Sequence, residues 1–302
     1  MRALMLGLVM LLGSVVPLNT ATAQAAAAPA AAVTKVAAPK KKTVAYGRSA
    51  KQKFDIYWTK SNKARPAVVL VHGGYWWGGD RSQMRTQGRA FAKRGYVTFA
   101  ISYRLSTQAV WPAQRNDVGS AITRIRANAK KWGVDRSRIV VVGSSAGGQL
   151  ATMEGVYGRG LSHVRGIVAL SPVNSPLRGY TEGGRMDADG LTKNLRRSII
   201  QLLGCTPFPY DTDCWPRLLD ATPEQHASVG DAPMLIIHSA ADFVGPEHSM
   251  SLKAALKSHG VPVTLVSIPG HLHGIEMMKN KNVSARVLAW IAKLVKPAAR
   301  KK

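Results

Sequence analysis

The sequence of 302 residues has little cysteine and little negative charge. It contains two Cys, and 16 Asp plus Glu stand against 42 Lys plus Arg, so that the net charge is +26. Two cysteines are too few for a domain framed by several disulfides. The hydrophobic fraction of 46% is too high for a disordered polycation. The composition therefore indicates a globular protein, long enough for one large α/β domain or two smaller ones.

The N-terminus has the pattern of an export signal. Arg2 precedes an almost entirely apolar run from Leu4 to Leu18, and the small residues at 21–23 (Ala-Thr-Ala) fit a signal-peptidase site. The alternative, a membrane anchor, needs about 20 apolar residues, and this run ends sooner. We expect residues 1–23 to be a cleaved signal peptide and the protein to be periplasmic or secreted. No cysteine follows the cleavage site, so a lipid anchor is not indicated.

Two basic segments flank the body of the chain. Residues 24–43 are rich in Ala, Pro and Lys and read as a solvated linker, and residues 296–302 repeat that chemistry as a tail. Between them, residues 44–295 are expected to form one folded domain. We find no internal repeat in it.

The domain alternates short Val- and Ile-rich runs with longer helical patterns, which predicts an α/β fold with a mostly parallel, doubly wound sheet. The segment at 53–58 alternates and predicts an antiparallel edge strand. Residues 172–231 break the rhythm, apart from a helical patch at 191–203, and are interpreted as a short inserted cap region over the strand ends. The expected strands are 66–72, 96–103, 138–143, 164–170, 234–238 and 261–268, and the expected helices are 87–93, 113–131, 146–157, 248–258 and 282–295.

A G-x-S-x-G motif at 143–147 lies between a predicted strand and a predicted helix, which is the context that this motif requires. Ser145 is its central residue and the candidate nucleophile, whereas Ser144 is off-centre. The turn is so sharp that only glycine fits at 143 and 147. The N–H group of Ala146 then points to where an oxyanion would form. The alternative is a small-residue turn that only lets the helix pack on the strand.

The segment HGGYWWGGD at 72–80 follows the first long strand of the body and predicts an oxyanion loop. We expect the N–H groups of Gly74 and Tyr75 to act together with that of Ala146. His72 and Gly73 shape the loop, with the His72 ring fixing the turn by a hydrogen bond rather than acting as a base. Trp76, with Trp77 beside it, either lines an acyl or aryl pocket or packs over the sheet.

A serine hydroxyl needs an imidazole base, and the imidazole needs a carboxylate to orient it. In chain order the acid follows the serine and the histidine comes last. Asp242 leaves a predicted strand in a turn and is preferred to Asp220, Asp231 and Glu247. His273, in the form His-Gly after the last strand, is preferred to His271. His163, His226 and His248 are interpreted as surface or packing residues.

No metal site is expected, because His271 and His273 lack a convincing third ligand. Cys205 and Cys214 are close in the insertion and are expected to form a disulfide in an oxidising compartment, with free thiols as the alternative. The positive charge could attract anionic envelope surfaces through the basic tails, or it could be a general solubilising composition. No motif for reading nucleic acid accompanies the charge, so no specific nucleic-acid partner is expected.

With these residues in place, the chain resembles the α/β-hydrolase superfamily, and within it the esterase and lipase group that includes the bacterial feruloyl-esterase-like domains. The resemblance covers about residues 44–295 and includes a loop similar to that of kynurenine formamidases. Tyr75, where lipase relatives usually have a third glycine, and Ile275, where an aromatic residue is common, depart from the pattern. The segments that carry the resemblance are HGGYWWGGD, SYRL at 102–105, WPAQRNDV at 111–118, WGVDRSRIVVVGSSAGGQLA at 132–151 and the turns at Asp242 and His273.

The resemblance implies a triad of Ser145, Asp242 and His273, hydrolysis through an acyl-enzyme and no cofactor. The expected function is a secreted serine ester hydrolase that acts on a small-molecule ester with a short-chain or aryl group. Two alternatives stay open: an arylformamidase-like amide hydrolase, and a non-catalytic hydrolase-fold protein that binds the envelope.

Overall fold

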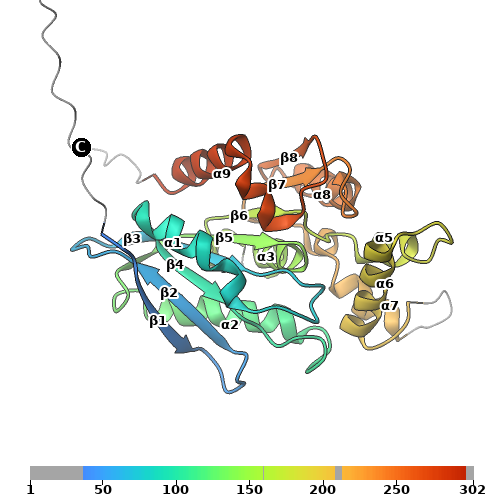
Figure 1. Ribbon diagram of the computed structural model, residues 1–302, viewed down its shortest axis with the longest axis horizontal. Coiled ribbons are helices and arrows are strands. Elements are labelled where there is room, and N and C mark those ends of the chain that lie inside the picture. The colour runs from blue at the N-terminus through green and yellow to red at the C-terminus, as the bar shows by residue number, and fades with distance from the viewer. Residues whose placement is uncertain (1–36, 159, 208–212, 297–302) are drawn as a thin grey trace, which may run out of the picture. The chain divides into compact units, whose positions relative to one another are not determined.

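A computed structural model of the chain describes residues 37–158, 160–207 and 213–296, and the predicted signal peptide lies outside them. Its centre is an eight-stranded sheet with the strand order β1-β2-β4-β3-β5-β6-β7-β8 (Figure 1). β1 and β2 pair antiparallel with each other, β2 pairs antiparallel with β4, and the remaining strands run parallel. The strands are β1 (Lys40–Ala45), β2 (Lys53–Trp58), β3 (Arg65–Val71), β4 (Val97–Ile101), β5 (Val134–Ser144), β6 (Gly166–Leu170), β7 (Met234–Ser239) and β8 (Val263–Ile268).

Helices cover both faces of the sheet, which is why its central strands are almost continuously apolar. One face packs on α1 and α9, and the other packs mainly on α2, α3 and α8. This is the fold predicted from the alternation of strands and helices. The helices and 3₁₀ turns are η1 (Arg81–Met84), α1 (Arg85–Lys93), α2 (Ala113–Ala127), α3 (Ala146–Val156), α4 (Gly160–His163), α5 (Pro176–Glu182), α6 (Gly190–Leu203), α7 (Cys214–Asp220), η2 (Pro223–His226), η3 (Pro246–Ser249), α8 (Met250–Ser258), η4 (Gly274–Lys279) and α9 (Lys281–Leu294).

The structure corrects the N-terminal boundary of the domain. Residues 40–43 were assigned to the solvated linker, but they belong to β1, in which Lys40 pairs with Trp58 and Lys42 with Ile56. β1 is the outer strand, so β2 is antiparallel as predicted but does not lie at the edge. The sequence did not predict this strand, because the side chains of its three lysines are exposed and leave no apolar pattern. An exposed edge strand needs no apolar pattern, and charged side chains protect it from pairing with other chains.

The insertion between β6 and β7 is helical and contains α5, α6, α7 and η2. Figure 1 shows α5, α6 and α7 grouped at the end of the domain that lies away from β1. The predicted helical patch at 191–203 is α6, which Asp189 caps by accepting a hydrogen bond from the Thr192 N–H group at 2.7 Å. Cys205 and Cys214 form the expected disulfide, with Cα atoms 5.7 Å apart. The bridge joins the end of α6 to the start of α7.

Candidate active site

The candidate residues lie on loops that leave the carboxyl ends of four parallel strands. His72 follows β3, Ser145 follows β5, Asp242 follows β7 and His273 follows β8. These strands lie in one half of the sheet, in the order β3-β5-β6-β7-β8, so their carboxyl ends meet along one edge. Such an edge is where open α/β sheets place their ligand sites.

Ser145 sits at the top of a strained turn between β5 and α3. Its φ of 54° and ψ of −122° are costly for a residue with a side chain. A Cβ atom at Gly143 would lie 2.1 Å from the Gly147 carbonyl oxygen, and one at Gly147 would lie 2.2 Å from the His72 carbonyl oxygen. Both positions therefore exclude any residue but glycine, as the motif predicted. The turn is also fixed by the Ser145 N–H group, which donates to the Leu170 carbonyl at 2.8 Å.

Asp242 and His273 come from neighbouring strand ends and form a hydrogen-bonded pair. The His273 Nδ1 atom lies 2.8 Å from Asp242 Oδ2 and 3.0 Å from Oδ1. The Asp242 side chain is 1% exposed, whereas that of His273 is 28% exposed. A buried carboxylate on Nδ1 fixes the orientation of the ring and leaves Nε2 as the nitrogen that can accept a proton.

Two buried serines that the sequence analysis did not single out for this role fasten the His273 loop. The Ser171 hydroxyl donates to Asp242 Oδ2 at 2.6 Å and accepts from the Gly274 N–H group at 3.1 Å. The Ser144 hydroxyl accepts from the Ile275 N–H group at 2.9 Å. Ser171 is fully buried and has a φ of 45°. In the sequence, the one feature that could have pointed to Ser171 is its position directly after β6. That strand lies between β5, which precedes Ser145, and β7, which precedes Asp242.

The loop after β3 presents backbone N–H groups beside Ser145. A Cβ atom at Gly73 would lie 3.0 Å from the Ser145 Cβ atom, so the loop backbone touches the turn. Gly74 and Tyr75 have φ values of 109° and 54°. Among the described residues, the N–H groups of Gly74, Tyr75 and Ala146 have no hydrogen-bond partner. Three unpaired donors are what a developing oxyanion requires.

The buried His72 side chain holds the backbone of this loop. Its ring is fully buried, stacks on Tyr103 at 4.4 Å between ring centroids, and places Nδ1 2.7 Å from the Gly73 carbonyl oxygen. Burial lowers the pKa of His72 to about 4. The imidazole is therefore neutral at physiological pH and holds the turn, while the Tyr103 hydroxyl donates to the His72 carbonyl at 3.0 Å.

Trp76 packs in the core, which decides between the two roles left open for it. It is fully buried with a φ of 58°, and its Nε1 group donates to Gln149 Oε1 at 3.2 Å. The Gln149 amide in turn donates to the Ala221 carbonyl at 2.7 Å. Trp77 is half-buried and contacts Tyr75, with ring centroids 5.6 Å apart.

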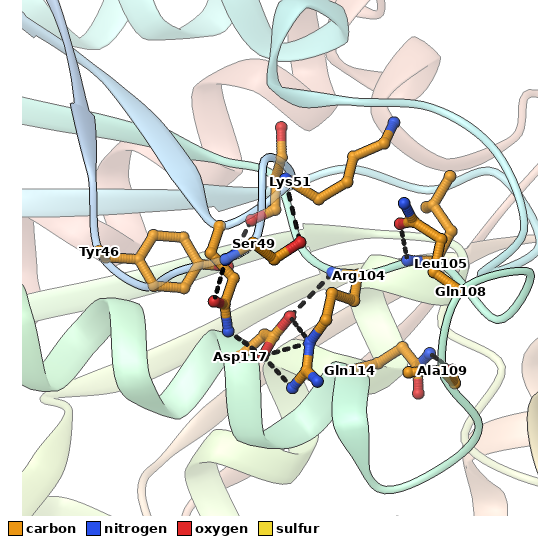
Figure 2. A network of polar contacts seen from close by, with 11 residues as sticks. Tyr46, Ser49, Lys51, Arg104, Leu105, Gln108, Ala109, Gln114 and Asp117 are labelled. Atoms are coloured by element: carbon orange, nitrogen blue, oxygen red, sulfur yellow. Dashed lines mark hydrogen bonds and ion pairs between the residues drawn. The ribbon is translucent and has the colours of Figure 1, made fainter.

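A polar network steadies the segment that covers Trp76. Figure 2 shows Arg104 reaching Asp117 on α2, with a shortest ion-pair distance of 2.6 Å. Gln52 in the β1–β2 turn donates to the same Asp117 carboxylate at 2.7 Å. The segment then continues to Ser106, whose N–H group donates to the Trp76 carbonyl at 2.9 Å. The motifs at 102–105 and 111–118 therefore support the oxyanion loop from a distance.

The Phe243 ring packs against the His273 imidazole, and Tyr75 packs against Phe243 in turn. Phe243, next to Asp242, lies 4.5 Å from His273 and 6.0 Å from Tyr75, measured between ring centroids. The Tyr75 hydroxyl lies 3.4 Å from the Leu191 carbonyl of α6, at the limit of hydrogen bonding. Burial raises the pKa of Tyr75 to about 12, so the phenol is neutral. The insertion is thus in contact with the oxyanion loop.

The competing candidates lie elsewhere. His271 is exposed, and His163 and His248 are buried 3.3 Å from Glu154 and 3.5 Å from Glu182. His226 contacts Asp220, which pairs with Arg115 at 2.7 Å. Asp231 is bonded to Ser228, and Glu247 is exposed.

The described residues hold neither a cluster of metal ligands nor a membrane-spanning helix. No group of three His, Cys, Asp or Glu side chains could hold a metal ion. No helix in the described ranges is both long and apolar enough to cross a membrane.

The sheet and the site loops define an α/β hydrolase. The sequence model of the BD-FAE family matches residues 54–256, which is more than half of the chain, and the chain belongs to that family. Esterase LipC of Mycobacterium tuberculosis is 31% identical over 252 residues, covering 79% of this chain and 60% of LipC. Isoprenylcysteine alpha-carbonyl methylesterase ICME of Arabidopsis thaliana is 25% identical over 77% of this chain and 56% of its own length. The chain thus spans little more than half of these relatives.

Solved structures share the fold. Esterase B from Lactobacillus rhamnosis has a TM-score of 0.72 at 20% identity, covering 86% of this chain and 87% of that one. A truncated carbohydrate esterase from gut microbiota has a TM-score of 0.71 at 24% identity, covering 86% and 98%. At these identities the likeness concerns the fold alone.

Proposed function

We propose that this protein is a serine carboxylic ester hydrolase that acts through Ser145, His273 and Asp242. The observation that carries the proposal is the Asp242–His273 pair, set on the strand ends beside the strained Ser145 turn. The named esterases among the relatives support the same reaction class.

The chemistry follows from the geometry. The Ser145 hydroxyl attacks the ester carbonyl while His273 Nε2 accepts its proton, and Asp242 stabilises the imidazolium that forms. The N–H groups of Gly74, Tyr75 and Ala146 bind the oxyanion. His273 then gives its proton to the departing alcohol, which leaves an acyl group on Ser145. A water molecule, deprotonated by the same imidazole, releases the acid and restores the serine.

Short-chain or aryl esters are the proposed substrates. Phe243 places an aromatic ring against His273, Tyr75 packs against Phe243, and Trp76 is buried in the core. The same machinery would cleave an aryl formamide, so that substrate remains the alternative within this mechanism.

We also propose that the protein is exported to the periplasm or beyond. The Cys205–Cys214 disulfide supports this, because such bonds persist in oxidising compartments. Localisation of the full chain by cell fractionation tests it, and a soluble cytosolic protein with residues 1–23 intact would contradict it.

The test of the reaction is hydrolysis of p-nitrophenyl acetate, butyrate and octanoate by the wild type and Ser145→Ala. Loss of the nucleophile is expected to lower kcat/KM by about 10⁴-fold or more. Ser144→Ala is the control at the adjacent hydroxyl, and it is expected to retain far more activity because Ser144 only fastens the His273 loop. Equal activity of Ser145→Ala and wild type would refute the mechanism. An aryl formamide hydrolysed faster than all three esters would favour the alternative.

A further inference from the structure

A cavity lies at the opposite end of the sheet from the candidate active site. It has a volume of about 380 Å³ and is bordered by Trp58 at the end of β2, Arg65 at the start of β3 and Trp132 after α2. β3 runs from this cavity to the loop of His72, and its seven residues span about 20 Å. A ligand in this cavity therefore cannot reach Ser145. We refer to the cavity as the basic Trp groove.

Positive charge dominates the basic Trp groove. Five cationic side chains line it, and no acidic residue is among its described lining residues. Within the described chain, the four exposed lysines of this lining make no ion pair. The five are Lys42, Lys60, Lys63, Arg65 and Lys131, and all but Arg65 are exposed.

Arg65 has an unused donor there. Its Nη1 group donates to Thr59 at 3.1 Å, but its Nε atom is buried and has no hydrogen-bond partner. Burial also lowers the pKa of Arg65, because the guanidinium has lost part of its hydration. An anion bound at the guanidinium would neutralise a charge that has lost part of its hydration.

The two tryptophans add rigid apolar surface. Trp132 meets the buried Phe54 edge-on at 5.4 Å and is tilted against Phe99 at 5.5 Å, so the core fixes its orientation. Trp58 pairs across the strands with Lys40, which extends the positive charge along β1. Rigid rings between cations suit a ligand whose anionic groups are separated by apolar faces.

We propose that the basic Trp groove binds an acidic polysaccharide, with one sugar ring against the tryptophans and its carboxylate on Arg65. The cavity has the volume of a small-ligand pocket, which accommodates a sugar unit. Single-stranded nucleic acid instead needs a groove that follows several successive phosphates. Carboxylates of adjoining sugars would meet Lys60, Lys63 and Lys131 at the rim.

This inference concerns binding and does not rest on ester hydrolysis. Bound in this way, the enzyme would stay on an anionic polymer while the opposite edge of the sheet remains open to substrate. Retention of this kind raises the effective concentration of substrate groups on the same polymer.

The experiment measures binding of the mature protein to polygalacturonate, with dextran as the neutral polymer. Lys60→Ala/Lys63→Ala is compared with Lys257→Ala/Lys293→Ala, which removes the same charge from α8 and α9. We expect no binding to dextran and about tenfold weaker polygalacturonate binding for the first double variant only. Ser145→Ala should bind like the wild type, and p-nitrophenyl butyrate hydrolysis should be unchanged in both double variants.

Several outcomes overturn the proposal. Equal weakening in both double variants would mean that binding follows net charge and not the groove. Failure of the wild type to bind polygalacturonate would also refute the proposal. Tighter, groove-dependent binding of oligo-dT or of anionic phospholipid vesicles would assign the groove to those ligands instead.

The ring contact is tested separately. Trp58→Leu is expected to weaken binding severalfold while Trp58→Phe retains it, with melting temperatures measured for both. Unchanged binding by Trp58→Leu would remove the sugar-ring contact and overturn the polysaccharide assignment.

Discussion

The two strained turns of the candidate site are held in place by different means. At Ser145 the backbone itself is packed so closely that glycine is obligatory at 143 and 147. At Tyr75 and Trp76, both with left-handed φ, the turn is held by side chains from distant segments, including Gln149 and Tyr103. The first kind of constraint leaves a short sequence motif. The second is spread over the chain and leaves none.

Breaking the backbone contact should have the largest effect. In Gly147→Ala the new methyl group would meet the carbonyl oxygens of His72 at 2.2 Å and Val71 at 2.5 Å. Because backbone cannot give way there, we expect a loss of stability of about 4 kcal/mol or more, and no activity. Gly190→Ala is the matched control, since a Cβ atom at that position has nothing within 4 Å. Chemical denaturation of both variants measures the difference, and similar stabilities would show that the turn has room.

Breaking the side-chain support should cost less. Gln149→Leu removes the partners of Trp76 Nε1 and of the Ala221 carbonyl, both in the core. Leaving buried polar groups unpaired is expected to cost about 2–3 kcal/mol. We also expect kcat to fall while KM changes little, because the oxyanion donors Gly74 and Tyr75 directly precede Trp76 and would move with it. Full retention of kcat would indicate that Trp76 does not position the loop.

The Ser171 hydroxyl links the acid to the histidine loop, because it bonds both to Asp242 and to the Gly274 N–H group. Ser171→Gly removes the hydroxyl and relieves the strain of a φ of 45° at the same time. We therefore expect kcat to fall about 10- to 100-fold, as for the loss of one hydrogen bond to a charged group. Stability should change less than in Ser171→Ala, where the strain persists. An unchanged kcat in both variants would assign Ser171 to packing alone.

Two buried histidines should give the smallest effect, a pH dependence of stability. Burial lowers the pKa of His72 and of His238 to about 4, from an ordinary value of 6.5. The unfolded chain therefore binds more protons below pH 6.5, and stability falls until the pH passes about 4. Between pH 7 and 6 we expect the two together to cost about 1 kcal/mol. Denaturant melts across this range measure the loss, and a stability that rises on acidification would contradict it.

Much of the site could be predicted because the relevant constraints are local. The pattern at 143–147 identified the Ser145 turn, and the strand ends gave Asp242 and His273, which the structure pairs. Ser171 and Ser144 could not be assigned their roles in this way. Each acts through a hydrogen bond to a segment more than 70 residues away. No spacing along the chain encodes such a contact.

The linker boundary was misplaced for a related reason. Lys40 to Lys42 have the composition of a solvated segment, but their backbone pairs with β2. Backbone pairing at an exposed edge depends on a neighbouring strand and not on the side chains of the edge strand.

By itself the sequence determined the parallel sheet with its covering helices and the sharp turn at Ser145, because apolar periodicity and obligatory glycines act within a few residues. Only the tertiary structure decided that Trp76 is core, that two serines fasten the His273 loop, and that scattered cations and two tryptophans form one groove. Those features arise from side chains that meet across the sheet, and their separation along the chain leaves no pattern to predict them.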